Sequence, residues 1–311
     1  MATGLWTHDA FAGHVTPQGH PEQVARITAV QQALADSRFD SLQRHDAPLA
    51  DDVPLLRCHP QRYIDRIVAA EPDAGSVQLD ADTHMSQGSV AAARRAVGGA
   101  IAAVDAVMTG QVANAFVAAR PPGHHAERET PMGFCLFGTV AIAAKHALDT
   151  YGLSRIAVVD FDVHHGNGTQ DLLWDEGRAV FFSSHQSPLW PGTGHPHERG
   201  AHDTIINIPL DPDSGGAAMR AAYDAQVFPV LSALKPELIL VSAGFDAHVD
   251  DPLANLRWTT QDFAWLTGRL CDLADELCGG RLVSVLEGGY DLAALGQSVA
   301  AHVDVLMQRG S

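Results

Sequence analysis

Apolar residues recur at the spacing of one helix face in four segments of the chain. We therefore predict helices over residues 23–37, 86–109, 216–234 and from Thr259 or Thr260 to Gly279. Ser86 is a candidate N-cap of the second helix, and Gly110 is its expected stop. Pro229 should kink or interrupt the third helix, because proline lacks a backbone N–H.

Six short runs between these segments are almost continuously apolar: 115–119, 156–161, 179–182, 205–210, 238–242 and 282–286. Runs that are apolar on both faces are typical of parallel strands covered by helices. Strands that alternate with helices predict a doubly wound α/β sheet. No repeat or long linker interrupts the chain, so we expect one domain over residues 1–311. The stretch 187–203, rich in Pro, Gly and His, is expected to be a long loop, which is often functional.

Ionisable side chains follow four of these predicted strands. Asp160, Asp162 and His164 follow the strand at 156, and Asp246 follows the strand at 238. The strand at 282 runs into Glu287 and Tyr290, and the strand at 115 runs into His124 and His125. Ligands of open α/β sheets gather at the carboxyl ends of the strands, so we expect these groups to share one rim.

Three of these residues form a candidate metal site. Asp162 and His164 are two residues apart, so their side chains point the same way in an extended segment. Asp246 can complete a set of three N and O ligands, which is typical of catalytic zinc, with Fe²⁺ as a competitor. Placing buried carboxylates together is unfavourable without a cation. Taken singly, an Asp at the end of a strand is more often a turn or helix-cap residue than a metal ligand.

The remaining polar groups supply what an amide hydrolase needs around such a metal. His124 or His125 can take a proton from water and return it to the leaving amine. Asp160 and Asn167 can orient these histidines by accepting their other N–H. Tyr290 can donate its hydroxyl to the developing oxyanion. Together these groups point to hydrolysis, although a lone His pair is more often a solvated or structural feature.

Charge narrows the choice of partner. The 311 residues carry a formal net charge of −17. This balance argues against direct nucleic-acid binding, which needs clustered Lys and Arg. It suits a cationic substrate, such as a lysine-rich polypeptide or a polyamine, although solubility alone also accounts for it.

The remaining composition points to the cytoplasm. The four cysteines, Cys58, Cys135, Cys271 and Cys278, form no C-x-x-C pair, so we expect reduced and mostly buried thiols. Residues 1–14 lack a basic region followed by an apolar run, so we expect no signal peptide. No stretch of about 18 apolar residues suggests a membrane span.

Five motifs, in order, resemble the histone deacetylase superfamily. They are Arg120–His125 (RPPGHH), Gly133–Phe137 (GFCLF), Asp160–Gln170 (DFDVHHGNGTQ), Ala243–Asp246 (AGFD) and Glu287–Tyr290 (EGGY). The resemblance extends from His20 to the end of the chain and is strongest to class II and bacterial class II-like members, which include acetylpolyamine amidohydrolases. It implies an arginase/deacetylase-like fold, with a central, mostly parallel sheet of about eight strands flanked by helices.

The resemblance assigns roles that match those argued from the residues. It implies that Asp162, His164 and Asp246 bind zinc, and that His124 and His125 are the tandem histidines, with His125 as general base and acid. It gives Asp160 and Asn167 as their partners and Tyr290 as the residue that polarises the carbonyl.

The same resemblance implies further sites. Phe134, Gly133 and Trp190 correspond to the tunnel that holds an acyl-lysine stem. Asp160 and Ser183 correspond to a structural potassium site, and Arg26 to a residue beside an internal acetate channel.

Two positions depart from the family pattern. Gly138 stands where many relatives have Asn, which we expect to affect packing. Leu253 stands where polyamine-selective eukaryotic relatives carry Glu, and losing that carboxylate weakens the polyamine interpretation.

We therefore predict a cytoplasmic, bacterial, zinc-dependent hydrolase acting on linear amides, with N-ε-acyl-lysine as the first candidate substrate. An acetylpolyamine or other small-amide hydrolase is the alternative. An arginase-type enzyme with two manganese ions would need more carboxylates and has no counterpart of Tyr290. A non-catalytic metal-binding sensor remains the alternative of another class, and a homo-oligomer is compatible with the sequence.

Overall fold

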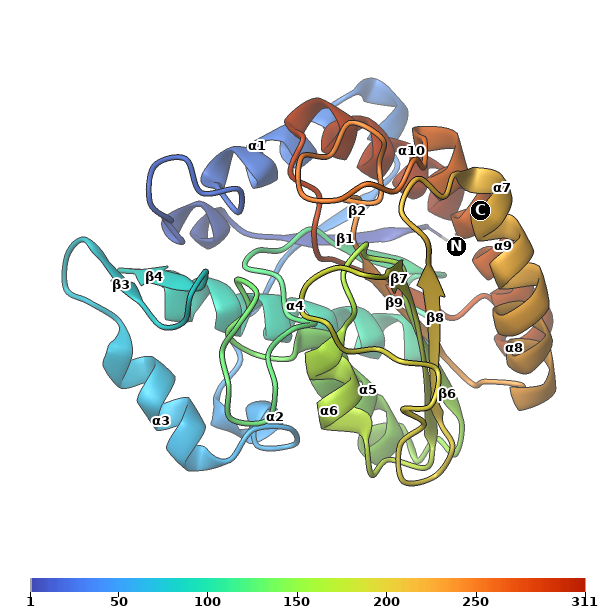
Figure 1. Cartoon of the computed structure of the whole chain (residues 1–311), viewed down its shortest axis with the longest axis horizontal. Helices are drawn as coiled ribbons and strands as arrows, with labels where there is room; N and C mark the ends of the chain where they lie inside the picture. The colour runs from blue at the N-terminus through green and yellow to red at the C-terminus, as the bar shows by residue number, and fades with distance from the viewer. Residues whose placement is uncertain (1, 311) are drawn as a thin grey trace.

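A parallel eight-stranded sheet forms the centre of the computed structural model, which describes residues 2–310 (Figure 1). The strand order is β2-β1-β5-β10-β9-β6-β7-β8, and a separate antiparallel pair joins β3 to β4. The strands are β1 (Gly4–Thr7), β2 (Gln43–Asp46), β3 (Ser76–Gln78), β4 (His84–Ser86), β5 (Ala115–Val117), β6 (Ile156–Asp160), β7 (Ala179–Gln186), β8 (Ile205–Leu210), β9 (Ile239–Ala243) and β10 (Leu282–Leu286).

Helices connect these strands and cover the sheet. They are α1 (Val24–Ala33), α2 (Asp52–Leu55), α3 (Gln61–Ala70), α4 (Ser89–Met108), α5 (Thr139–Tyr151), α6 (Asn167–Leu173), α7 (Gly216–Ala222), α8 (Phe228–Leu234), α9 (Thr260–Cys278) and α10 (Leu292–Gly310). Short 3-10 turns lie at Asp9–Gly13 and Ser37–Phe39, and a π-helical turn lies at Tyr223–Val227.

The two faces of the sheet are covered by different helices (Figure 1). On one face, α4 packs on β1, β5 and β10, and α5 packs on β6 and β9. On the other face, α9 and α10 pack on each other, and His302 of α10 bonds to Ser284 of β10. This double cover explains why every residue of β5, β6, β9 and β10 is buried.

All six strands predicted from apolar runs are present, but β1, β2, β3 and β4 were not predicted. Every residue of β2, with the sequence QRHD, is exposed. It pairs with β1 at the edge of the sheet, where burial does not select apolar side chains. The apolar-run criterion therefore misses it.

The predicted helices are present with corrected boundaries. Helix α4 begins at Ser89, not at a cap on Ser86, whose backbone N–H instead donates to Ser89 Oγ at 2.8 Å. The third segment divides at Tyr223–Val227, before Pro229, because Pro229 lies in the first turn of α8, where its missing N–H has no partner to lose. Helix α9 has the expected ends, with a Thr259–Asp262 capping box and Gly279 in the left-handed conformation.

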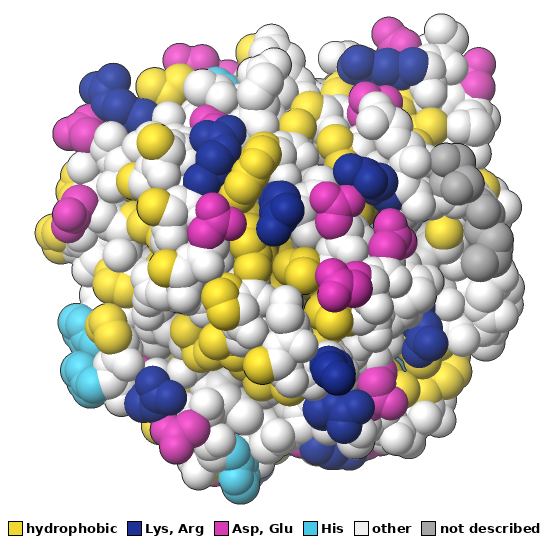
Figure 2. All heavy atoms as spheres, turned by 90° about the vertical axis from the view of Figure 1, so that its right-hand side faces the viewer, with side chains coloured by type: hydrophobic (Ala, Val, Ile, Leu, Met, Phe, Trp, Pro, Cys, Tyr) yellow, Lys and Arg dark blue, Asp and Glu magenta, His cyan; other side chains and the backbone are white. Residues whose placement is uncertain are grey.

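Within residues 2–310, no helix combines the length and the apolar character that crossing a membrane requires. All four cysteines are buried and unpaired, as expected. On the face that carries α7, α8 and α9, basic and acidic side chains are mixed and neither sign forms a broad patch (Figure 2).

Candidate active site

The four strands that end in ionisable residues are neighbours in the sheet, in the order β5-β10-β9-β6. All of their pairings are parallel, so their carboxyl ends lie along one stretch of the same edge. The sequence predicted a shared rim, and the strand order makes the groups adjacent along it.

Asp162, His164 and Asp246 converge as predicted. Each offers a ligand atom, and these atoms lie within 4.8 Å of one another. His164 Nδ1 is 3.2 Å from both Asp162 Oδ1 and Asp246 Oδ2. The two carboxylates are almost fully buried, at 0% and 1% exposure. This N and O donor set fits a divalent ion such as zinc.

The backbone around the triad has no room for side chains. Gly288 N–H donates to Asp162 Oδ2 at 2.8 Å, and Val163 N–H donates to Asp246 Oδ1 at 2.8 Å. A Cβ at Gly288 would overlap Asp246 Oδ2 and lie 2.6 Å from Asp162 Oδ2. Glycine at this position therefore lets the 287–290 loop close over the carboxylates.

Electrostatics at the triad favour positive charge. Burial and the charge of Asp162 raise the pKa of Asp246 to about 7. Burial acts to lower the pKa of His164, but Asp162 and Asp246 outweigh it and raise that pKa to about 10. A cation bound between the three ligand atoms would compensate the negative charge of the same two carboxylates.

The tandem histidines have opposite environments, although their ring centroids are only 3.9 Å apart. Burial lowers the pKa of His124, but the charges of Asp162 and Asp160 outweigh burial and hold this pKa well above the usual value. Burial is the largest cause, and the charges of His124 and His164 add to it, so the pKa of His125 lies well below the usual value for histidine. The pair therefore combines a charged imidazole with a neutral one.

The partners of these histidines are the predicted ones. His124 Nδ1 lies 3.0 Å from Asp160 Oδ2, and His125 Nδ1 lies 2.7 Å from Asn167 Oδ1. Asn167 Nδ2 donates to Glu127 Oε1 at 2.9 Å, so its oxygen is the atom that faces His125. His125 Nδ1 is thus the donor, which leaves Nε2 free to accept a proton.

Tyr290 lines the same site and is 8% exposed. Its ring contacts Phe134 edge-on at 5.8 Å, and the Arg26 guanidinium carbon lies 4.8 Å from its ring centroid. Burial raises the pKa of Tyr290 well above its usual value, so its hydroxyl keeps its proton. It is therefore available as a hydrogen-bond donor.

A cavity of about 190 Å³ connects these groups to the surface. Its lining includes the site residues His125, His164 and Tyr290, the three predicted tunnel residues Gly133, Phe134 and Trp190, and also Leu253. Trp190 is 40% exposed and packs edge-on against His125, with ring centroids 4.7 Å apart. The cavity is therefore walled largely by aromatic and aliphatic side chains and reaches the triad at His164.

Comparisons with known proteins agree with this geometry. Residues 20–306 match the family model described as the histone deacetylase domain. The chain belongs to the histone deacetylase family.

Its relatives include a histone deacetylase-like amidohydrolase of Pseudomonas aeruginosa, 41% identical over 94% of this chain and 77% of the relative. Histone deacetylase 10, chloroplastic, of Oryza sativa subsp. japonica is 39% identical over 95% of this chain and 71% of the relative. The crystal structure of the HDA15 HD domain superposes with a TM-score of 0.91 at 30% identity, covering 98% of this chain and 90% of that one. Membership supports hydrolysis of an acylated amine as the activity.

The two departures from the family pattern lie in different surroundings. A Cβ at Gly138 would overlap Leu172 Cδ1, which agrees with the expected effect on packing. Leu253 lines the cavity itself, so its side chain faces whatever enters.

Two further family expectations remain predictions. Asp160 pairs in register with Ser183 across β6 and β7, but Ser183 Oγ lies 3.0 Å from His185 Nδ1, and no finding tests a potassium ion there. Arg26 is fully buried and donates to the carbonyls of Gly289 and Glu287, both at 2.6 Å. Arg26 therefore lies against the 287–290 loop, which carries Tyr290. Its relation to an acetate channel stays a prediction.

Two carboxylates of the site received no role from the sequence. Glu287 is fully buried and accepts hydrogen bonds from the backbone of Gly123 at 2.6 Å and His124 at 3.1 Å. Asp251, 7% exposed, accepts the Tyr290 N–H at 2.7 Å. Glu287 stands three residues before Tyr290 in the sequence, but the backbone groups that donate to it lie in the loop after β5. Asp251 carried no signal beyond its place after Asp246.

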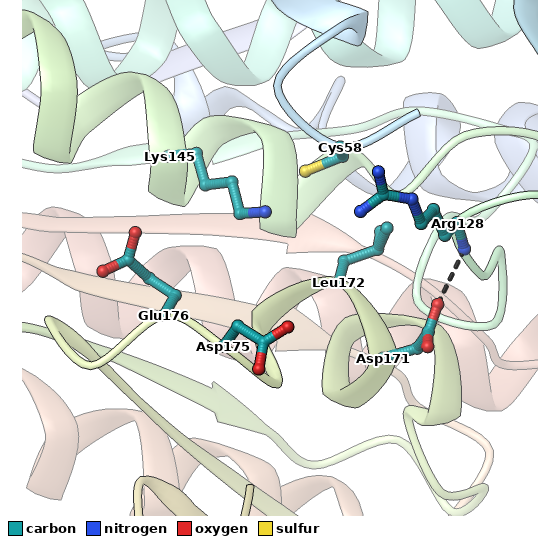
Figure 3. A pocket seen from close by; sticks show the side chains of 7 residues that line it. All are labelled: Cys58, Arg128, Lys145, Asp171, Leu172, Asp175 and Glu176. Carbon is teal, nitrogen blue, oxygen red and sulfur yellow. Dashed lines mark hydrogen bonds between the residues drawn. The ribbon is translucent and has the colours of Figure 1, made fainter. Parts of the chain in front are cut away.

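A second cavity, of about 130 Å³, lies beside α5 and α6 (Figure 3). Its lining is Cys58, Arg128, Lys145, Asp171, Leu172, Asp175 and Glu176. It contains none of the predicted site residues, and within residues 2–310 only the triad brings three metal-ligating side chains close enough to hold one ion. The chemistry therefore belongs to the cavity above the strand ends.

Proposed function

We propose that this chain is a zinc-dependent deacylase that removes acyl groups from the ε-amine of lysine. The observation that carries this proposal is the meeting of a buried Asp-His-Asp triad, two differently charged histidines and Tyr290 at the end of one apolar cavity. A module that only bound its ligand would not need a proton acceptor and a hydroxyl donor beside the metal ligands.

Asp162, His164 and Asp246 would hold the zinc. When bound, such an ion polarises an amide carbonyl and makes water more acidic. The almost complete burial of the two carboxylates supports this assignment, because a cation stabilises charges that are otherwise expensive to bury.

His125 would move the proton. Its Nδ1 is fixed by Asn167, and its lowered pKa keeps Nε2 unprotonated and ready to accept. It would take a proton from the attacking water and then give it to the departing amine. His124, hydrogen-bonded to Asp160, would contribute positive charge beside it. Tyr290 would donate its hydroxyl to the carbonyl oxygen as charge develops there.

The cavity walls support a long aliphatic substrate stem. Phe134 and Trp190 are aromatic, and Leu253 adds an apolar side chain at the position where polyamine-selective relatives carry Glu. These walls suit the methylene chain of lysine better than a second ammonium group. Asp82, which also lines the cavity, favours acetylpolyamine as the second candidate, because its carboxylate can face a cation.

The test is a matrix of acyl groups and amines offered to zinc-loaded protein, with metal content measured by elemental analysis. We expect one zinc per chain and higher kcat/KM for acyl-lysine peptides than for N-acetyl polyamines. His125→Ala should lower kcat by roughly 10²–10⁴ while zinc stays bound. His202→Ala, which alters an exposed histidine, is the matched control and should leave kcat unchanged.

Three results would contradict the proposal. Higher kcat/KM on N-acetyl polyamines would favour the second candidate. Two manganese ions per active chain would indicate an arginase-type enzyme. No hydrolysis of any acylated amine by zinc-loaded protein would favour a sensor.

A further inference from the structure

Asp251 connects two segments that are distant in sequence. It lies in the loop between β9 and α9, where its own backbone N–H donates to His248 O at 2.9 Å. Its Oδ1 accepts the Leu253 N–H at 3.0 Å, and its Oδ2 accepts the Tyr290 N–H at 2.7 Å and the Asp291 N–H at 3.4 Å. One buried carboxylate thus binds backbone donors on both segments.

The two main targets of this carboxylate both line the substrate cavity. Leu253 forms part of its wall, and Tyr290 carries the hydroxyl proposed to polarise the carbonyl. Tyr290 lies outside any regular element and follows Gly289, which has φ of +119°. The backbone of such a segment is flexible, so its position depends on hydrogen bonds to the residues around it.

We propose that Asp251 is a positioning residue. It fixes the position of the Tyr290 hydroxyl relative to the Leu253 side chain in the cavity. The inference rests on the proposed function, because the position of Tyr290 affects the rate only if its hydroxyl acts in the reaction. Asp251 touches neither substrate nor metal in this role. It acts through the backbone of the two residues that do line the cavity.

Both carboxylate oxygens are needed for this arrangement. An Asn at position 251 offers one oxygen, so its NH₂ group would face either the Leu253 or the Tyr290 N–H. Two donors would then oppose each other in a buried place, and one of the segments would shift. A shift on the order of 1 Å at a reacting group lowers the rate by as much as about 10²-fold.

The test is a double-mutant cycle with Asp251→Asn and Tyr290→Phe in the zinc-loaded full chain, using the best acyl-lysine peptide. Tyr290→Phe alone should lower kcat on the order of 10²-fold. Asp251→Asn should lower kcat by roughly tenfold when Tyr290 is present. In the Tyr290→Phe background the same change should lower kcat less than about threefold, because no hydroxyl is then left to position.

Asp250→Asn is the matched control. Asp250 is the neighbouring carboxylate, its side chain is 69% exposed, and its one ion-pair partner is His248, at 3.6 Å. It should leave kcat unchanged in both backgrounds. Zinc content and thermal unfolding are measured for every variant, and Asp251→Asn should retain one zinc per chain. If Asp251→Asn does not fold, Asp251→Glu, which keeps both oxygens but displaces them, takes its place with the same expectation.

The outcomes separate this inference from the proposed function. If Tyr290→Phe leaves kcat unchanged, the proposed function is wrong in its use of Tyr290. If Tyr290→Phe is impaired but Asp251→Asn has the same fold effect in both backgrounds, Asp251 has a general structural role and the positioning role is overturned. Loss of zinc from Asp251→Asn would likewise overturn it.

Discussion

At the scale of single residues, the site depends on where side chains are absent as much as on where they are present. Gly133 has φ of +55°, and a Cβ there would overlap the His125 ring and lie 2.6 Å from Trp190. Gly192, in the neighbouring loop, has φ of +82° but nothing within 4 Å of its would-be Cβ. The two glycines therefore share a backbone requirement and differ in what surrounds them.

We predict that Gly192→Ala loses about 1 kcal/mol of stability, because it places an L-residue in the left-handed region, and that Gly133→Ala loses more, because its methyl group also overlaps His125 and Trp190. Only Gly133→Ala should lose most of its activity, because its methyl group displaces His125 or Trp190. Thermal unfolding and kcat/KM, measured side by side, check this. Equal activity in the two variants would show that the contact with His125 does not matter for turnover.

At the scale of elements, the packing of α9, α10 and β10 buries a titratable group that has no part in the proposed chemistry. His302 of α10 is 1% exposed, and it contacts Thr267 of α9 at 2.7 Å and Ser284 of β10 at 2.9 Å. Burial lowers the pKa of His302 from 6.5 to about 3. The folded state therefore holds a neutral imidazole where the unfolded chain takes up a proton.

This arrangement predicts acid lability with a defined sign. Between pH 6.5 and about 3 the unfolded state binds more protons than the folded state, so the free energy of unfolding falls as the pH is lowered. His302 alone contributes up to about 1.4 kcal/mol per pH unit in that window. In urea titrations, His302→Gln should reduce the pH dependence, while His202→Gln, at an exposed position, should not. An unchanged pH dependence in His302→Gln would show that His302 is protonated in the folded protein.

At the scale of the whole molecule, the net charge of −17 gives a long-range field that attracts cations. On the face in Figure 2 the two signs are mixed, so this attraction is a property of the total charge and not of a patch there. Salt screens such a field within about 10 Å at 0.1 M ionic strength.

We therefore predict that kcat/KM for an acyl-lysine peptide flanked by lysines falls as sodium chloride is raised, while kcat changes little. The same peptide flanked by alanines should show a much weaker salt effect. Steady-state kinetics across a salt series measure both. Identical salt responses of the two peptides would mean that the acidic surface serves solubility and does not attract substrate.

The sequence alone determined the parts of this protein that depend on local pattern. Continuous apolar runs identified six of the eight strands of the sheet, because most positions of these strands are buried and burial favours apolar side chains. Motifs at the strand ends identified the Asp162–His164–Asp246 set and the histidine pair, because parallel strands bring their carboxyl ends to one edge. The exposed edge strand β2 gave no such signal.

Only the tertiary structure decided what joins segments that are distant in sequence. The order β5-β10-β9-β6 makes the four strand ends neighbours, and helix packing, not local pattern, sets that order. Glu287 reaches the histidine loop and Asp251 reaches Tyr290 through backbone N–H groups, which every residue except proline has. A hydrogen bond from a backbone N–H does not require any particular residue type at the donor position, so it cannot be recognised in the sequence. For this reason the sequence revealed the groups proposed to carry out the chemistry but not the carboxylates that hold them in place.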